Sequence, residues 1–286
     1  MAEIINGKLV SEKLRLELKE EIAKFKAECG ITPGLAVVKV GNDPASAVYV
    51  RNKHKACLDV GIESYQIELP EDISESELLS KIDELNADSR VNGILVQLPL
   101  PRGINEERVI ERISPKKDVD AFHPSNVGRI MIGNYSFLPC TPAGIISLLD
   151  YYGVEISGKR CAVIGRSNIV GKPMALLLTE RNGTVTLCHS KTSDLEKICL
   201  DSDIVVVAIG RAKFLRADMV KPGAVIIDVG INRLPDGKLC GDVDFDEVSK
   251  IASMITPVPG GVGPMTITTL LRNTLFAAKM QYLEIN

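Results

Sequence analysis

The chain has 286 residues, enough for two modest domains, and its 45% hydrophobic and 25% charged residues are ordinary for a globular protein. Its net charge is −3, and its lysines and arginines are scattered, which argues against a nucleic-acid-binding surface. No apolar stretch approaches the roughly 18 residues that span a membrane, and the N-terminal residues resemble neither a signal peptide nor a transit peptide. We therefore expect a cytoplasmic protein that binds no nucleic acid and no membrane.

The cysteines and histidines give no sign of a metal site. Seven cysteines are widely spaced without a CxxC pair, and the three histidines form no HxxxH spacing. The spacing that zinc ligands usually show is therefore missing. Scattered cysteines in odd number are typical of reduced, mostly buried thiols in a reducing compartment. The sequence predicts no catalytic metal.

The first half of the chain alternates helical patterns with short apolar runs. Residues 11–29 place apolar side chains on one helical face, with Ser11 as the N-cap and Gly30 just past the end. Ser74 and Glu77 form a capping box that begins a later helix, and a turn at residues 41–44 begins another helix that runs to Gly61. The predicted strands are 35–40, 65–69 and 93–98. This alternation predicts parallel βαβ units.

A connector at residues 120–140 separates the halves, after which Thr141 is the predicted N-cap of a helix ending at Gly153. Short apolar runs then recur and predict five strands of a doubly wound nucleotide-binding sheet, residues 160–164, 184–188, 204–209, 224–229 and 253–256. A closing helix at 266–283 is expected to return to the first domain. The sequence thus predicts an α/β protein with a catalytic domain at 1–140 plus 267–286 and a Rossmann-like domain at 141–266.

The first strand of the second domain runs into a glycine-containing turn, residues 165–173, and then into a helix. The turn is not GxGxxG, but a strand, a glycine turn and a helix N-terminus together favour a bound phosphate. An NAD site needs an acidic residue at the end of the next strand, which here is predicted at residues 184–188. No carboxylate lies between the end of this strand and Asp194. Arg166 can instead pair with a 2′-phosphate. The turn therefore favours NADP over NAD, and an ordinary βα turn is the alternative.

Five blocks, in order, resemble the methylenetetrahydrofolate dehydrogenase/cyclohydrolase family and together span nearly the whole chain. They are residues 49–53 (YVRNK), 93–99 (GILVQLP), 117–120 (KDVD) followed by 139–142 (PCTP), 165–173 (GRSNIVGKP) and 257–266 (PVPGGVGPMT). Two positions depart from the family pattern, since Ala121 stands where glycine is usual and Ala212 where proline is common. Neither departure removes a functional side chain, so each bears on loop shape alone.

The resemblance implies an activity. The enzyme would oxidise 5,10-methylenetetrahydrofolate to the methenyl form with NADP and then hydrolyse it to 10-formyltetrahydrofolate. These reactions belong to one-carbon metabolism and supply purine biosynthesis. The resemblance also implies a homodimer formed through the cofactor domains.

The resemblance further implies the residues of a folate site in a cleft between the domains. The implied catalytic and substrate-binding residues are Tyr49, Lys53, Gln97 and Asp120, with Pro259, Gly260 and Gly261 bringing backbone against the folate. The implied cofactor-binding residues are Gly165, Arg166, Ser167, Ser190 and Ile231.

Lys53 is the candidate proton acceptor for hydrolysis, oriented by Gln97, and it shares a helix face with Tyr49 because the two are four residues apart. A lysine base at neutral pH needs a pKa about 3 units below its usual value of about 10.4. The expected causes are burial and cationic charge from the methenyl group, Arg51 or Lys55.

Taken singly, each of these residues has an ordinary role as solvated surface, loop cap or tight turn. Two other functions also stay open. A two-domain NADP dehydrogenase of the shikimate or amino-acid type should carry a Lys–Asp pair in its first domain. A nucleotide-sensing module would have no need of Lys53. An assay of methylenetetrahydrofolate with NADP or NAD separates these three functions.

Overall fold

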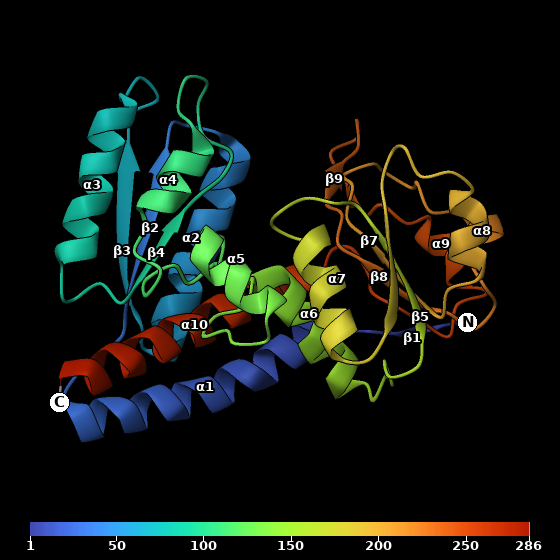
Figure 1. Ribbon diagram of the computed structural model, residues 1–286, viewed down its shortest axis with the longest axis horizontal. Coiled ribbons are helices and arrows are strands. Elements are labelled where there is room, and N and C mark those ends of the chain that lie inside the picture. The colour runs from blue at the N-terminus through green and yellow to red at the C-terminus, as the bar shows by residue number, and fades with distance from the viewer. Residues whose placement is uncertain (286) are drawn as a thin grey trace. The chain divides into compact units, whose positions relative to one another are not determined.

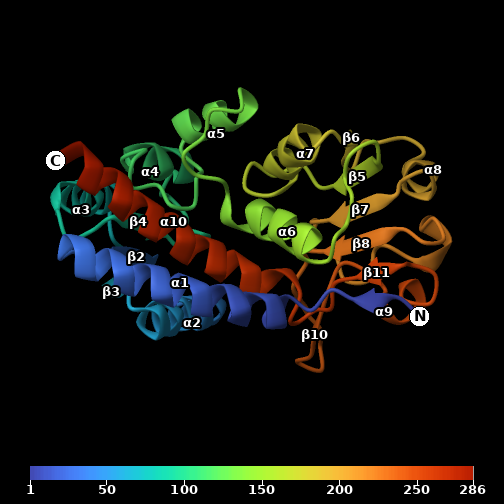
Figure 2. The same cartoon turned by 90° about the horizontal axis from the view of Figure 1, so that it is seen from below.

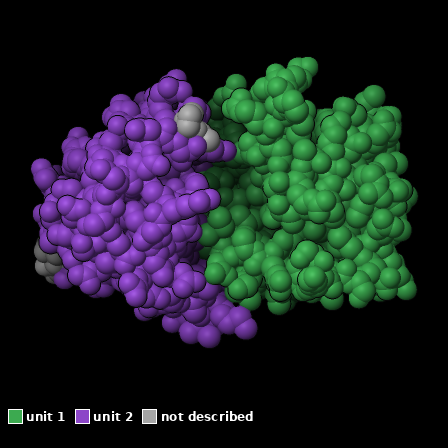
Figure 3. All heavy atoms as spheres, turned by 90° about the horizontal axis from the view of Figure 1, so that it is seen from above, with its two compact units in different colours: residues 1–12, 139–266 green, residues 13–138, 267–286 purple. Residues whose placement is uncertain are grey.

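The computed structural model describes residues 1–285, except for the side chains of residues 44, 45 and 285. It divides into two compact units, coloured in Figure 3. Unit 1 contains residues 1–12 and 139–266, and unit 2 contains residues 13–138 and the segment from residue 267 onward. The predicted first domain began at residue 1, whereas residues 1–12 belong to unit 1. The reason is β1 (Glu3–Ile4), which pairs in parallel with β11 (Met254–Ile255).

Unit 2 is built on a parallel sheet in the order β3-β2-β4 (Figure 1). Its strands are β2 (Gly34–Val40), β3 (Glu63–Leu69) and β4 (Gly93–Val96), which confirms the three predicted strands. Helix α3 (Glu75–Ala87) and helix α4 (Glu106–Arg112) pack their apolar side chains on one face of this sheet. Helix α2 (Pro44–Val60) packs against β2 and β3 on the opposite face. The connection from β2 to β3 crosses the sheet in one direction and the connection from β3 to β4 crosses it in the other, so two right-handed crossovers place α2 and α3 on opposite faces.

The helix ends in the first half of the chain follow the predicted signals with one exception. The carboxylate of Asp43 accepts a hydrogen bond from the N–H of Ser46 (2.6 Å) at the start of α2, and both hydrogen bonds of the capping box at Ser74 are present. The prediction for Ser11 was wrong, because α1 (Gly7–Cys29) begins at Gly7 and encloses Ser11. The apolar pattern that defined this helix starts later than its hydrogen bonds do.

Helix α10 (Val262–Ile285) ends in unit 2, where it runs alongside α1 (Figure 2). The rings of Phe25 and Tyr282 meet edge to face with centroids 6.1 Å apart. Arg15 also donates from Nε to the hydroxyl of Thr268 at 3.0 Å. None of the helices among the described residues is both long and apolar enough to cross a membrane.

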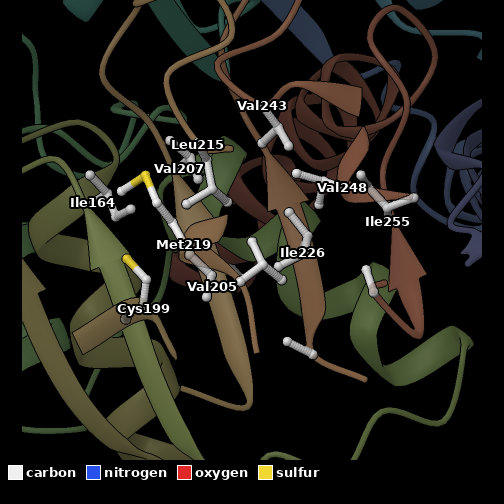
Figure 4. Close-up of a cluster of buried hydrophobic side chains, with 14 of the residues drawn as sticks. Ile164, Cys199, Val205, Val207, Leu215, Met219, Ile226, Val243, Val248 and Ile255 are labelled. Carbon is white, nitrogen blue, oxygen red and sulfur yellow. The ribbon is translucent and has the colours of Figure 1, made fainter. Parts of the chain in front are cut away.

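Unit 1 holds a six-stranded parallel sheet in the order β1-β11-β8-β7-β5-β6. The five predicted strands are present, namely β5 (Arg160–Ile164), β6 (Thr184–Cys188), β7 (Ile204–Val207), β8 (Val225–Asp228) and β11. Apolar side chains from α8 (Leu195–Leu200), η1 (Ala217–Met219) and α9 (Phe245–Val248) pack on one face (Figure 4). Helix α7 (Gly171–Glu180) packs on β5 and β6 and against α6 (Cys140–Tyr151). The doubly wound α/β prediction is confirmed.

Three local features differ from the sequence prediction. Thr141 is not an N-cap, since α6 begins at Cys140 and the Thr141 hydroxyl lies 3.0 Å from that of Thr266. The connector contains a short helix, α5 (Pro124–Met131). A two-stranded antiparallel hairpin of β9 (Asn232–Arg233) and β10 (Leu239–Cys240) follows β8. The two strands of the hairpin are too short to produce a periodic pattern.

The core of unit 2 gives a first prediction. Leu78 of α3 is fully buried, whereas Leu16 of α1 is 67% exposed. We expect Leu78→Ala to lower the free energy of unfolding by about 2–5 kcal/mol, because it leaves a cavity. The matched change Leu16→Ala should stay within about 0.5 kcal/mol. Urea unfolding followed by circular dichroism measures both, and equal losses would contradict the packing described.

Candidate active site

Lys53 and Gln97 form a hydrogen-bonded pair in unit 2. Lys53 lies on α2 and is only 9% exposed, and its Nζ donates to Oε1 of Gln97 at 3.0 Å. The Gln97 amide is held in turn, since its Nε2 donates to the carbonyl of Leu98 at 2.8 Å. Its backbone N–H donates to the carbonyl of Val38 at 2.8 Å, which fixes it at the carboxyl end of β4. Open parallel sheets bind ligands at this edge.

Tyr49 lies one turn before Lys53 on α2 and is 38% exposed. Burial raises the pKa of its phenol above the ordinary value, so the hydroxyl stays protonated at neutral pH. Within residues 1–285 its hydroxyl has no hydrogen-bond partner. The ring and hydroxyl therefore remain available to a ligand, next to the buried amine.

The loop that carries Asp120 is held by its neighbour Asp118, which the sequence did not single out. The buried Asp118 carboxylate accepts hydrogen bonds from Nδ2 of Asn126 (2.8 Å) and from the N–H groups of His123 (2.8 Å) and Phe122 (3.3 Å). Burial raises the pKa of Asp118, and these hydrogen bonds oppose the rise. Asp120 is half-buried and accepts no hydrogen bond from a described residue. One carboxylate thus shapes the loop, and the other is free for a ligand.

The departure at Ala121 lies in the same loop. Ala121 is buried and adopts φ 58°, in the left-handed region that glycine favours. The usual family glycine therefore suits this backbone, and alanine keeps the same conformation at a cost of about 1 kcal/mol.

Pro259, Gly260 and Gly261 lie in unit 1, in the loop between β11 and α10. Gly260 has φ 103° and its carbonyl accepts a hydrogen bond from the N–H of Lys8 at 2.9 Å. A side chain at Gly261 would place Cβ 2.6 Å from the carbonyl oxygen of Pro257. The loop is therefore fixed in shape and exposes backbone in place of side chains.

The turn after β5 in unit 1 can be formed only with its two glycines. Gly165 has φ 121°, and a Cβ there would lie 2.3 Å from the carbonyl oxygen of Ala208. A Cβ on Gly171 would lie 1.9 Å from the carbonyl oxygen of Gly165. The Ser167 hydroxyl accepts hydrogen bonds from the N–H groups of Val170 (3.2 Å) and Gly171 (3.3 Å) and so caps the start of α7. It keeps its own proton for donation to a ligand.

The same turn fits a phosphate-containing cofactor. Among the described residues, the backbone N–H groups of residues 166–169 donate to no protein atom, so four successive amides remain for an anion. The Arg166 side chain is exposed, and within residues 1–285 it forms no ion pair. No cluster of three or more His, Cys, Asp or Glu residues suited to a metal ion occurs in the described part of the chain.

Ser190 and Ile231 complete the predicted cofactor residues, and both lie beyond the carboxyl ends of strands of the unit 1 sheet. Ser190 is exposed, two residues after the end of β6. Ile231 is 46% exposed, and its Cδ1 would lie 3.9 Å from a Cβ on Gly263. The five cofactor residues lie in unit 1, and the four polar folate residues lie in unit 2.

The chain is similar to known proteins along its whole length. The model of the tetrahydrofolate dehydrogenase/cyclohydrolase catalytic domain matches residues 5–120, and that of the NAD(P)-binding domain matches residues 139–282. The bifunctional protein FolD of Halalkalibacterium halodurans is 61% identical over 278 residues, 97% of this chain and 99% of the relative.

Solved structures show the same likeness. The bifunctional enzyme FolD from Campylobacter jejuni has a TM-score of 0.96 at 51% identity, covering 98% of this chain and 100% of that one. The Trypanosoma brucei enzyme, solved with NADP cofactor and an inhibitor, has a TM-score of 0.94 at 40% identity, covering 98% of each chain.

These matches exclude a shikimate-type dehydrogenase and a nucleotide sensor, the two alternatives that the sequence left open. They cover both units and nearly every residue of the relatives. The chain belongs to the tetrahydrofolate dehydrogenase/cyclohydrolase family and is a bifunctional enzyme with an NAD(P)-binding domain.

Proposed function

We propose that this chain oxidises 5,10-methylenetetrahydrofolate with NADP and then hydrolyses the methenyl product to 10-formyltetrahydrofolate, a one-carbon donor for purine biosynthesis. The observation that carries the proposal is the buried Lys53 amine, hydrogen-bonded to Gln97 at the carboxyl end of β4. Tyr49 shares the helix with Lys53, and the free Asp120 carboxylate adds a second recognition group. This arrangement suits a flat, polar substrate that undergoes a proton transfer.

The folate residues hold the substrate for hydride transfer. The Tyr49 ring stacks on the flat pterin or aminobenzoyl group. The Asp120 carboxylate accepts hydrogen bonds from the amino and ring N–H groups of the pterin. The loop of Pro259, Gly260 and Gly261 presents backbone to the same substrate. A bound NADP would supply the hydride acceptor, and the residues of the chain accelerate this step mainly by positioning the substrate.

Hydrolysis is the step in which Lys53 acts. Water adds to the methenyl carbon, and one of its protons passes to the neutral Lys53 amine. The bond from this carbon to N5 then breaks while the Lys53 ammonium returns the proton to N5 and the hydroxyl loses its proton to solvent, which leaves the formyl group on N10. Burial and the positive charge of the methenyl group both favour the neutral amine. Arg51 and Lys55, considered as further sources of cationic charge, are both exposed on α2, where solvent weakens their effect. Gln97 orients the amine through the hydrogen bond from Nζ to Oε1.

The turn after β5 binds the cofactor in this proposal. The amides that follow Gly165 and the hydroxyl of Ser167 bind the pyrophosphate, and Arg166 with Ser190 binds the 2′-phosphate of NADP. Ile231 contacts the nicotinamide end. The NADP bound by the Trypanosoma brucei relative supports this assignment.

The proposal extends to a cytoplasmic homodimer joined through unit 1. Two observations support it. Strand β6 is an edge of the six-stranded sheet and keeps one side free for pairing within the described chain. All seven cysteines are free thiols, as a reducing compartment requires.

Arg166 tests the cofactor assignment. Arg166→Ala should raise the KM for NADP at least about tenfold, equivalent to about 1.4 kcal/mol, and affect NAD much less, because only NADP carries the 2′-phosphate. Arg160→Ala is the matched control, since Arg160 is exposed at the opposite end of β5. Steady-state kinetics with each cofactor measure the effect. Equal losses with NADP and NAD would remove Arg166 from the 2′-phosphate site.

Asp120 tests the folate assignment. Asp120→Ala should weaken folate binding in both reactions by about 1–3 kcal/mol, because the pterin N–H donors lose their acceptor. Asp59→Ala removes an exposed carboxylate of α2 and serves as the control. Folate KM values in the two assays report the change. A loss of NADP affinity with normal folate affinity would exclude Asp120 from the folate site.

Lys53 separates the two chemistries. Lys53→Met preserves length and packing but removes the titratable amine, so cyclohydrolase activity should fall roughly 10²–10⁴-fold. Dehydrogenase activity should fall less, and methenyltetrahydrofolate should accumulate with its near-ultraviolet absorbance. Lys55→Met, two residues along on the exposed side of α2, is the matched control.

The dehydrogenase and cyclohydrolase activities of the Lys53→Met variant are measured on the same preparation, and circular dichroism checks that this variant is folded. Retained cyclohydrolase activity, or an equal loss of both activities, would exclude Lys53 as the proton acceptor.

A further inference from the structure

Two fully or nearly buried carboxylates lie beside the carboxyl ends of β7 and β8 in unit 1. Asp228 is the last residue of β8 and is 3% exposed, and Asp242 follows the β9–β10 hairpin and is 0% exposed. Burying a carboxylate is unfavourable unless hydrogen bonds replace its lost hydration. Their hydrogen bonds show what these carboxylates organise.

Asp242 accepts four hydrogen bonds. Its Oδ2 accepts from the N–H groups of Ile209 (2.7 Å) and Gly210 (2.9 Å). Its Oδ1 accepts from the N–H of Arg211 (2.7 Å) and from Nδ2 of Asn232 (2.9 Å). Four donors around one carboxylate match the ionised form, which is an acceptor only. Asp242 therefore joins the loop after β7 to the start of the hairpin after β8.

Asp228 holds the other side of the same hairpin. Its Oδ1 accepts from the N–H groups of Gly230 (3.1 Å) and Asp242 (2.8 Å), and its Oδ2 accepts from the N–H of Val243 (2.9 Å). The Val243 side chain packs into the core of unit 1 (Figure 4). Burial raises the pKa of Asp228 to about 7, and the backbone hydrogen bonds act against the rise.

Two glycines allow the backbone to approach these carboxylates. A Cβ on Gly230 would lie 2.1 Å from Oδ1 of Asp242, and a Cβ on Gly241 would lie 1.8 Å from Oδ2 of Asp228. Neither position can accept a side chain unless the network moves. The carboxylates and glycines therefore form one close-packed arrangement.

The network touches two segments of the proposed cofactor site. Ile231 lies between Gly230, which donates to Asp228, and Asn232, which donates to Asp242. The loop held by Asp242 also lies against the phosphate turn, because a Cβ on Gly165 would lie 2.3 Å from the carbonyl oxygen of Ala208. The exposed Ile231 side chain thus depends on its neighbours for its position.

We propose that Asp242 and Asp228 are positioning residues for cofactor binding, which fix the loop of Ile231 and the loop of residues 209–211 at the carboxyl edge of the unit 1 sheet. The inference rests on the proposed function, in which Ile231 contacts the cofactor. Neither carboxylate is assigned a contact with substrate or cofactor. Their effect passes through backbone amides and Asn232.

Two variants of different severity test the proposal. Asn232→Ala removes one hydrogen bond to Asp242 and leaves the carboxylate and the backbone in place. It should raise the Kd for NADPH roughly three- to tenfold, the range expected for one hydrogen bond. Asp242→Asn turns one acceptor atom into a donor that faces N–H groups, so its effect should be larger. The KM for folate should stay within about twofold in both, because the folate residues of unit 2 are unchanged. The Kd is measured by titrating NADPH fluorescence.

Asp203 provides the matched control. Its carboxylate accepts from the N–H of Arg160 (2.9 Å) and pairs with Nζ of Lys221 (2.6 Å), at the amino end of the same sheet. Asp203→Asn should lower stability and leave the Kd for NADPH unchanged. An equal Kd change in Asp203→Asn, or no change in Asn232→Ala, would overturn the proposal. If Asp242→Asn does not fold, Asn232→Ala decides the question alone.

Ile231→Ala distinguishes this inference from the proposed function. Weaker NADPH binding in Ile231→Ala with normal binding in Asn232→Ala and Asp242→Asn would exclude only the positioning role. Normal binding in Ile231→Ala would exclude the assignment of Ile231 to the cofactor site, and the positioning role with it. Weaker binding in all three variants, with an unchanged folate KM, supports both.

Discussion

A parallel sheet imposes one constraint from which both candidate sites follow. Its strands end together at one edge, and the loops that leave this edge have no further strand to pair with. Their backbone N–H groups either stay available to a ligand, as those of residues 166–169 do, or need side-chain acceptors. In unit 1 Asp228 and Asp242 supply them, and in unit 2 Asp118 does so for the loop of Asp120. In both units a buried carboxylate shapes a loop, and the neighbouring residues of that loop keep their functional groups for a ligand.

The environment of a buried lysine decides what it can do. Lys39 is paired with Glu68 (3.1 Å), and Lys117 donates to the carbonyl groups of Leu85 (3.1 Å) and Asp88 (2.8 Å). Lys117 therefore has a structural role, closing α3 against the loop that follows α4. Lys53 donates to the uncharged amide of Gln97. An amide oxygen accepts more strongly from an ammonium group than from a neutral amine but can accept from both, so Gln97 can orient the nitrogen before and after it takes up a proton.

Most of the fold could be predicted because local signals and tertiary structure agree. Most strands of the two sheets, the turn that begins α2 and the capping box at Ser74 depend on residues close together in the chain. Strand β1 escaped prediction because two residues give no period, and it forms only through its pairing with β11. The role of Asp242 was equally hidden, because three of its donors lie some 30 residues earlier in the sequence.

The candidate site was predicted by a different route. The pattern Tyr49 to Lys53 indicated only a shared helix face, and the resemblance supplied the link to Gln97, which lies 44 residues beyond Lys53. Asp118 and Asp120 look alike in the sequence, and only the structure separates the carboxylate that accepts three hydrogen bonds from the one that accepts none among residues 1–285. Ionisable residues two apart can thus have opposite roles, which composition and spacing do not distinguish.

The difference in burial among the seven thiols leaves two cysteines, Cys29 and Cys240, open to chemical labelling. Five of the seven cysteines are buried, and burial raises the pKa of Cys57 and Cys199 to about 12 and of Cys161 to about 11. Since the thiolate is the reactive form, alkylating dyes should spare these side chains near neutral pH. Cys29, at the end of α1, and Cys240, in β10, are partly exposed and lie in different units. A donor and an acceptor fluorophore on this pair would report the distance between one residue of each unit without any introduced cysteine.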